Sequence, residues 1–91
     1  MTATLVYAIE FSRRAEKQFD KLSGEARARL KPAIDALADN PRPPGAKKLA
    51  GPEGLWRIRV GDYRIIYAIE YDRLLVLVVE VGHRREVYRR R

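Results

Sequence analysis

Arginine side chains recur at strand-like spacing in the last third of the chain. The segments that carry them are LWRIRV (residues 55–60), YRIIY (63–67) and VGHRREVY (81–88). Because side chains alternate between the two faces of a strand, Arg57 and Arg59 must share one face. Guanidinium groups that converge on one face suit phosphate, since each offers a rigid fork of donors. The spacing predicts a phosphate-binding face and a nucleic-acid partner.

The turn between the first two of these segments sets their register. Gly61-Asp62 fits a two-residue hairpin loop in which glycine supplies a positive φ. That loop pairs Arg59 with Arg64, and it also pairs Val60 with Tyr63, Ile58 with Ile65 and Trp56 with Tyr67. One face is then apolar and belongs to the core: Trp56, Ile58, Val60, Tyr63, Ile65, Tyr67 and Ile69. The other face holds Arg57, Arg59, Arg64, Ile66 and Ala68.

The next hairpin, around residues 71–73, allows two registers. A loop of odd length puts Leu75, Leu77, Val79 and Val81 on the core face and leaves Glu80, Gly82 and Arg84 beside Arg64. A loop of even length buries Glu80 against Ile65, which costs several kcal/mol unless the charge is paired. We expect the odd loop.

The first half of the chain predicts one strand and two helices. Residues 5–11 are rich in strand formers, and Ser12 is a candidate N-cap for a helix over 13–22. Ser23-Gly24 ends that helix, and a second one runs to about residue 38, with Pro32 expected to kink or split it. A Pro-rich loop at residues 40–45 follows. The predicted class is α+β: two N-terminal helices pack on one face of a small twisted antiparallel sheet, and an open basic face lies opposite.

Composition narrows the function classes. The 91 residues make one domain, over residues 1–91, with a formal charge of +7. Residues 46–91 carry 11 of the 19 Lys and Arg residues but 6 of the 12 acidic ones, which favours a polyanionic partner. There is no cysteine and one histidine, so neither a disulfide framework nor a metal site is expected. No secretion signal or membrane-length apolar run is evident, so we expect a cytoplasmic protein.

The residues present suit metal-free RNA cleavage better than other hydrolytic chemistry. The sequence lacks a nucleotide-binding glycine loop, a Ser-His-Asp set and paired carboxylates on one face. In RNA, the 2′-OH attacks its own neighbouring phosphate, so the protein must orient it, stabilise negative charge and move protons. Arginines supply the charge, and another group must act as acid or base.

Several further residues are candidates for this site. Tyr88 suits base stacking or proton transfer, or it is simply packed on a C-terminal turn. His83 has a suitable intrinsic pKa but points away from the face of Arg84. Lys47 and Lys48 are expected to contact backbone phosphates, and the tail of residues 89–91 adds sequence-independent affinity. Alternatively, carboxylates neutralise the arginines instead of an RNA phosphate; the candidates are Asp62, Glu80 and Glu86.

The motifs WRIRV, GDYRIIY and VGHRREVYR resemble the RelE branch of the RelE/ParE toxin superfamily over nearly the whole chain. The resemblance implies a ribosome-dependent, metal-free endoribonuclease that cuts mRNA in the ribosomal A site and is held inactive by a RelB-like antitoxin. It assigns catalytic roles to Arg64, Arg84 and Tyr88, and phosphate binding to Arg57 and Arg59. We add Lys47 and Lys48 to the phosphate-binding set, and we keep His83 and Arg85 as further candidates.

One departure from the family pattern matters for the mechanism. The best-known members have lysines where this chain has Arg57 and Arg59. Arginine is effectively always protonated, so neither residue can serve as general base, and the base is left unassigned. No cofactor is implied. The expected partners are mRNA, the ribosome with its rRNA and an antitoxin with acidic, amphipathic segments.

Two other functions remain open at this stage. A ParE-like protein would inhibit DNA gyrase by binding it, without nuclease activity. A non-catalytic RNA-binding module would use the same basic face. Substitution of Arg84 or Tyr88 separates catalysis from binding, and the order in which translation and DNA replication stop in cells separates the nuclease from the gyrase inhibitor.

Overall fold

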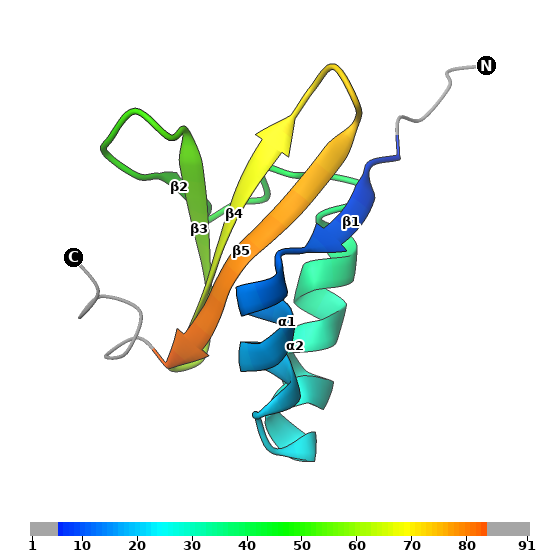
Figure 1. Cartoon of the computed structure of the whole chain (residues 1–91), viewed down its shortest axis with the longest axis vertical. Helices are drawn as coiled ribbons and strands as arrows, with labels where there is room; N and C mark the ends of the chain where they lie inside the picture. Colours follow the sequence, from blue (N-terminus) through cyan, green and yellow to red (C-terminus); the bar gives the residue numbers. More distant parts are fainter. Residues whose placement is uncertain (1–5, 84–91) are drawn as a thin grey trace.

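A computed structural model describes residues 6–83 as two helices lying together on one side of a five-stranded sheet (Figure 1). The strands are ordered β1-β5-β4-β3-β2 across that sheet. The α+β class and the two N-terminal helices are confirmed. In chain order the elements are β1 (Ala8–Phe11), α1 (Arg13–Asp20), α2 (Gly24–Ala36), β2 (Lys47–Lys48), β3 (Leu55–Val60), β4 (Tyr63–Glu70) and β5 (Leu75–His83).

Both helices begin at a serine cap. The Ser12 hydroxyl accepts a hydrogen bond from the Ala15 backbone N–H at 3.1 Å, which confirms the predicted start of α1. Ser23 caps α2 in the same way. Pro32 does not split α2, which continues to Ala36. Its ring is on the exposed side of the helix, while the buried side packs on the core and keeps the helix continuous.

The core lies between the helices and the sheet. Three of its side chains come from α1 and α2, a fourth is Leu37 at the C-cap of α2, and β3, β4 and β5 contribute the rest: Ala15, Leu30, Ile34, Leu37, Ile58, Ile65, Tyr67, Val76, Val78 and Val81. Tyr67 is the largest fully buried side chain, and its hydroxyl donates to the Pro41 carbonyl at 2.7 Å. This bond ties the Pro-rich loop to the centre of the sheet and satisfies a polar group that burial would otherwise penalise.

The sheet is mixed, which corrects the expectation of an antiparallel one. β1 runs parallel to β5, from the pair Ala8–Leu75 to the pair Phe11–Val78. The helical hairpin carries the chain over one face before it re-enters the sheet, so β1 is free to run alongside the last strand. Lys47 and Lys48 form the two-residue edge strand β2 against β3, although two consecutive lysines have little intrinsic preference for a strand.

The β3–β4 hairpin has the predicted register. Gly61 adopts a φ of 60°, and the pairs Val60–Tyr63, Arg59–Arg64, Ile58–Ile65 and Trp56–Tyr67 all form. Glycine reaches this left-handed conformation without the steric penalty that a Cβ would bring. The local turn signal was therefore sufficient to place the arginines of both strands on one face.

The β4–β5 hairpin has the even-loop register next to its loop and the odd-loop register further along the strands. Near the turn, Glu70 pairs with Leu75 and Tyr67 with Val78, as the even loop requires; after an irregularity between Ile66 and Tyr67, Ile66 pairs with Glu80. The expectation that Leu77 and Val79 face the core was wrong, because Val76 and Val78 occupy it. The predicted placements of Val81 on the core face and of Glu80 beside the arginines are confirmed.

Candidate nucleic-acid interface

The sheet face turned away from the helices carries the charged residues of the candidate site, and we call it the arginine face. Its members on adjacent strands form two rows across the sheet. Lys47, Arg57, Ile66 and Glu80 lie in one row, and Arg59, Arg64 and Gly82 lie in the other. Neighbouring strands are about 4.8 Å apart, so the cations of β2, β3 and β4 are close enough to contact one phosphate or two successive phosphates.

The arginine face is less open than the sequence suggested. Arg57 and Arg64 are 5% and 6% exposed, whereas Arg59 and Lys47 are exposed. Arg57 and Arg64 lie on the inner strands β3 and β4, where neighbours flank them on both sides, so the expectation of a fully open basic face was wrong. Buried guanidinium groups lose little side-chain freedom when an anion binds, and the low local dielectric strengthens that contact.

Two of the candidate residues lie on the opposite side of the sheet. Lys48 pairs with Trp56, which packs against the core, so its side chain is on the helix side while that of Lys47 is on the arginine face. His83 pairs with Tyr63, and the two rings pack edge to face with centroids 5.9 Å apart. The expectation that His83 points away from the arginines is confirmed. The alternation of the strands separates both residues from Arg57, Arg59 and Arg64.

Three candidates, Arg84, Arg85 and Tyr88, lie outside the described residues. Their catalytic or supporting roles therefore remain predictions. The strand that leads to them ends at His83, and its preceding residue, Gly82, is paired with Arg64.

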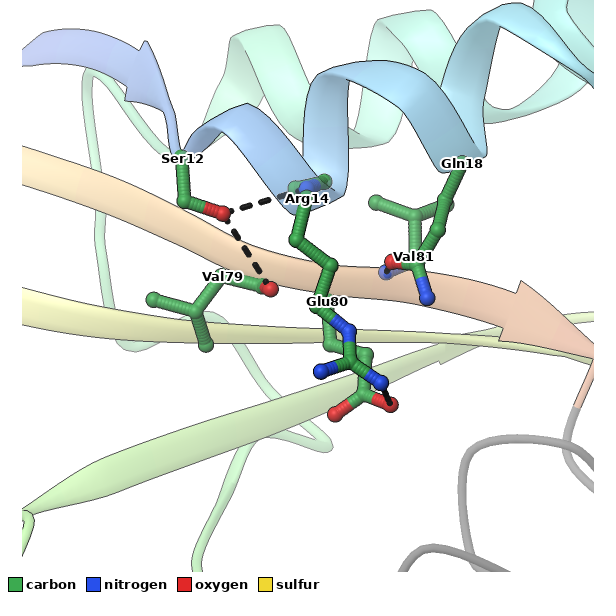
Figure 2. Close-up of polar contacts among 7 residues, drawn as sticks. Ser12, Arg14, Gln18, Val79, Glu80 and Val81 are labelled. Atoms are coloured by element: carbon green, nitrogen blue, oxygen red, sulfur yellow. Dashed lines mark hydrogen bonds and ion pairs between the residues drawn. The ribbon is translucent and has the colours of Figure 1, made fainter.

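Glu80 was expected beside the arginines, but its ion-pair partner Arg14 was not predicted from the sequence. The Arg14 guanidinium of α1 reaches across β5 to the Glu80 carboxylate, with Nη2 and Oε2 3.8 Å apart (Figure 2). The Glu80 side chain is 15% exposed and that of Arg14 is 43% exposed. No local signal links these residues, since they are 66 positions apart and meet because α1 packs along β5.

Helix α1 also replaces the strand pairing that β5 loses where β1 ends. The Ser12 N–H donates to the Val78 carbonyl at 2.8 Å and its hydroxyl donates to the Val79 carbonyl at 3.3 Å. The Gln18 side-chain oxygen accepts from the Val81 N–H at 2.8 Å (Figure 2). Backbone groups of β5 that an edge would leave unpaired are thus satisfied by the backbone and side chain of the N-cap Ser12 and by the side chain of Gln18 in α1.

Within residues 6–83, no group of three or more His, Cys, Asp or Glu side chains could hold a metal ion. In the same part of the chain, no helix is long and apolar enough to cross a membrane.

The fold and the arginine face together define a small basic α+β protein suited to a phosphate-rich partner. Residues 9–88 match the sequence model of the family described as "ParE toxin of type II toxin-antitoxin system, parDE". The chain belongs to this toxin family, and the expected kinship with the RelE branch is confirmed by its relatives.

The similarity to RelE proteins covers almost the whole chain. This chain is 32% identical over 88 residues to the mRNA interferase toxin RelE of Escherichia coli K12, and the match covers 92% of both chains. The E. coli RelBE toxin–antitoxin complex gives a TM-score of 0.75 at 29% identity, covering 85% of this chain and 95% of the other. The RelBE2 complex of Mycobacterium tuberculosis has the same fold, with a TM-score of 0.79 at 24% identity, covering 91% and 97%.

Proposed function

We propose that this chain is the toxin of a type II toxin–antitoxin pair and acts as a ribosome-dependent endoribonuclease that cuts mRNA in the A site. The observation that supports this most is the 32% identity to an mRNA interferase over 92% of both chains. The arginine face supplies the cationic surface that such an activity needs. Because its substrate is mRNA on the ribosome, the proposed site of action is the cytoplasm.

In the proposed reaction the RNA brings its own nucleophile. The ribose 2′-OH attacks the adjacent phosphorus, and negative charge builds on the phosphate oxygens. Arg64 and Arg57 would stabilise that charge from fixed, nearly buried positions, and Arg59 and Lys47 would hold the flanking phosphates at the exposed rim. Arg84 and Tyr88 would complete the catalytic set.

The proposed regulator is a cognate RelB-like antitoxin. Solved structures of RelE relatives from E. coli and from Pyrococcus horikoshii are complexes with RelB. On this chain, an acidic antitoxin segment would be attracted to the arginine face and would compete with RNA for the same guanidinium groups.

The test is primer extension on a reporter mRNA with purified ribosomes and the purified chain. We expect discrete cuts within codons that require ribosomes and disappear in the Arg84→Ala variant. Arg73→Ala is the matched control, since Arg73 lies in the turn after β4 and pairs with Glu70. If the wild-type chain makes no cuts with purified ribosomes but still arrests the growth of cells that express it, the nuclease function is rejected.

Inhibition of DNA gyrase is the second candidate, and the ParE description of the family model favours it. It predicts that DNA replication stops before translation in cells expressing the chain, and that purified gyrase loses supercoiling activity. A non-catalytic RNA-binding module is a third reading: it predicts ribosome binding without cleavage, and loss of that binding when the arginine face is neutralised.

A further inference from the structure

Strand β5 contains one extra residue at the point where it passes the arginine face. Tyr67 pairs with Val78, but the next residue of β4, Ile66, pairs with Glu80, so Val79 is left over in a bulge. Had the first register continued, Glu80 would lie opposite Ile65 on the core face. The bulge therefore moves the Glu80 carboxylate from the core to the row that also holds Arg57 and Lys47.

Helix α1 holds both sides of this bulge. Ser12 bonds to the carbonyl of Val79, and Gln18 bonds to the N–H of Val81, the residues directly before and after Glu80 (Figure 2). The Arg14 guanidinium then contacts the carboxylate itself. Backbone and side chain are thus fixed together, and the carboxylate is held largely out of water at the edge of the arginine face.

Among residues 6–83, the two rows of the arginine face contain one group that can accept a proton at neutral pH. Arginine is effectively always protonated, which excludes Arg57, Arg59 and Arg64 as bases, and Lys47 lies on the edge strand β2, three strands away from β5. His83, the sole histidine, lies on the other side of the sheet against Tyr63. A carboxylate is ordinarily ionised at this pH. Glu80 is therefore the group in these two rows that can accept a proton.

We propose that Glu80 is the general base of the RNA cleavage, an assignment that rests on the proposed nuclease function. Its carboxylate takes the proton from the ribose 2′-OH while the 2′-oxygen forms a bond to phosphorus. The bond from phosphorus to the 5′-oxygen breaks, and that oxygen takes a proton from water. The products are a 2′,3′-cyclic phosphate and a 5′-hydroxyl, and Glu80 returns its proton to solvent.

The arrangement of strands allows Arg64 to bind the phosphate while Glu80 accepts the proton. Arg64 lies opposite Gly82 and is therefore the diagonal neighbour of Glu80, at a Cα separation of about 7–8 Å. Two long side chains at this separation can reach a phosphate and the 2′-OH of the same nucleotide. The other explanation is that Glu80 is a counter-ion that moderates the positive charge of the face. When the charge of Glu80 is removed, the base role predicts slower cleavage, whereas the counter-ion role predicts cleavage as fast as wild type or faster.

The experiment is single-turnover cleavage of ribosome-bound mRNA by wild type, Glu80→Gln and Glu80→Asp, with ribosome affinity measured in parallel. A general base predicts that Glu80→Gln lowers the cleavage rate by about 10²- to 10⁴-fold while affinity is unchanged or higher. Glu80→Asp keeps a carboxylate and is expected to retain part of the rate. Glu10→Gln is the control, because Glu10 is an exposed carboxylate on the same face but opposite Leu77.

The pH profile provides a readout that a structural role would not change. The wild-type rate should rise with pH as the base ionises, and Glu80→Gln should lack this limb. Among residues 6–83, the charged groups around Glu80 on the neighbouring elements include Arg14 of α1, Arg64 of β4 and Arg57 of β3, with Glu10 of β1 further along. If Glu80→Gln cuts as fast as wild type or faster, the counter-ion role is correct. The base assignment then fails, while the proposed nuclease function stands. If wild type does not cut, the nuclease function and the base assignment both fail.

Discussion

Arg59 and Arg64 lie directly opposite each other across the β3–β4 hairpin. Like charges at such a position repel, and the repulsion is relieved when an anion lies between them. Arg59 is exposed and Arg64 is 6% exposed, so a phosphate bound as proposed would meet an exposed guanidinium at the rim and a nearly buried one beneath it. On the proposed function, a phosphate bound at this pair would offset the repulsion between the two guanidinium groups.

The first prediction concerns Arg59→Gln, which removes one charge and keeps a long side chain. In low salt without phosphate, we expect the free energy of unfolding to rise by about 0.2–1 kcal/mol as the repulsion is lost. Inorganic phosphate should stabilise wild type more than the variant. Urea denaturation with and without phosphate measures both effects, and Arg73→Gln serves as the control. Equal phosphate stabilisation of wild type and Arg59→Gln would contradict an anion site at this pair.

Lys47 and Lys48 provide a second test, because they are adjacent exposed lysines on opposite faces of the sheet. We expect Lys47→Gln to weaken binding of a single-stranded RNA oligomer and to reduce the slope of log affinity against log salt by about 0.7, the value for one phosphate contact. Lys48→Gln should change neither quantity. Fluorescence anisotropy over a series of salt concentrations would measure both, and similar effects from the two variants would argue against the arginine face as the RNA contact.

Local signals predicted the parts of the fold that depend on neighbours in sequence. Ser12 was predicted to cap α1 because a serine oxygen can bond to the N–H groups of the first turn, and Gly61 was predicted to mark the hairpin because it tolerates a positive φ. The Gly61 turn, together with the alternation of side chains along a strand, places Arg57, Arg59 and Arg64 on one face without reference to the rest of the chain. This part of the site could be predicted from the sequence.

The remaining parts depend on contacts between distant segments. Val76 and Val78 lie in the core, whereas Glu80 lies on the opposite face of the sheet, and no single loop length gives both placements. The bulge at Val79 allows both because it shifts the register between Val78 and Glu80. Its bonds to Ser12 and Gln18 span 67 and 63 positions. The parallel pairing of β1 and the low exposure of Arg57 likewise follow from packing of whole elements, which residue patterns do not encode locally.

A third prediction concerns Gln18, whose side-chain oxygen accepts from the N–H of the buried residue Val81. Gln18→Ala leaves that N–H without its acceptor, and we expect a loss of about 1–3 kcal/mol in the free energy of unfolding. Gln18→Glu keeps an acceptor and should lose less. Lys17→Ala, at an exposed position of the same helix, is the control. Urea denaturation gives the free energies, and faster hydrogen exchange at the Val81 amide would locate the effect; an unchanged exchange rate would show that the bond is unimportant.

The last prediction concerns the pH dependence that Tyr67 confers. Burial, with a smaller contribution from the nearby Tyr71, raises the pKa of Tyr67 from 10.0 to about 12. Between these values the unfolded chain has released the phenolic proton while the folded chain keeps it, so stability falls as pH rises. The contribution is complete below about pH 10 and amounts to roughly 2–3 kcal/mol, lost as the pH approaches 12.

Tyr67→Phe isolates this effect from the titration of the other tyrosines and the lysines. At neutral pH the variant should be less stable than wild type by about 1 kcal/mol, because the hydrogen bond to the Pro41 carbonyl is gone. Above pH 10 wild type should lose stability faster than Tyr67→Phe, so the difference between them should shrink and then reverse. Urea denaturation at a series of pH values measures this difference. A constant difference across the range would mean that Tyr67 ionises as readily in the folded protein as in the unfolded chain.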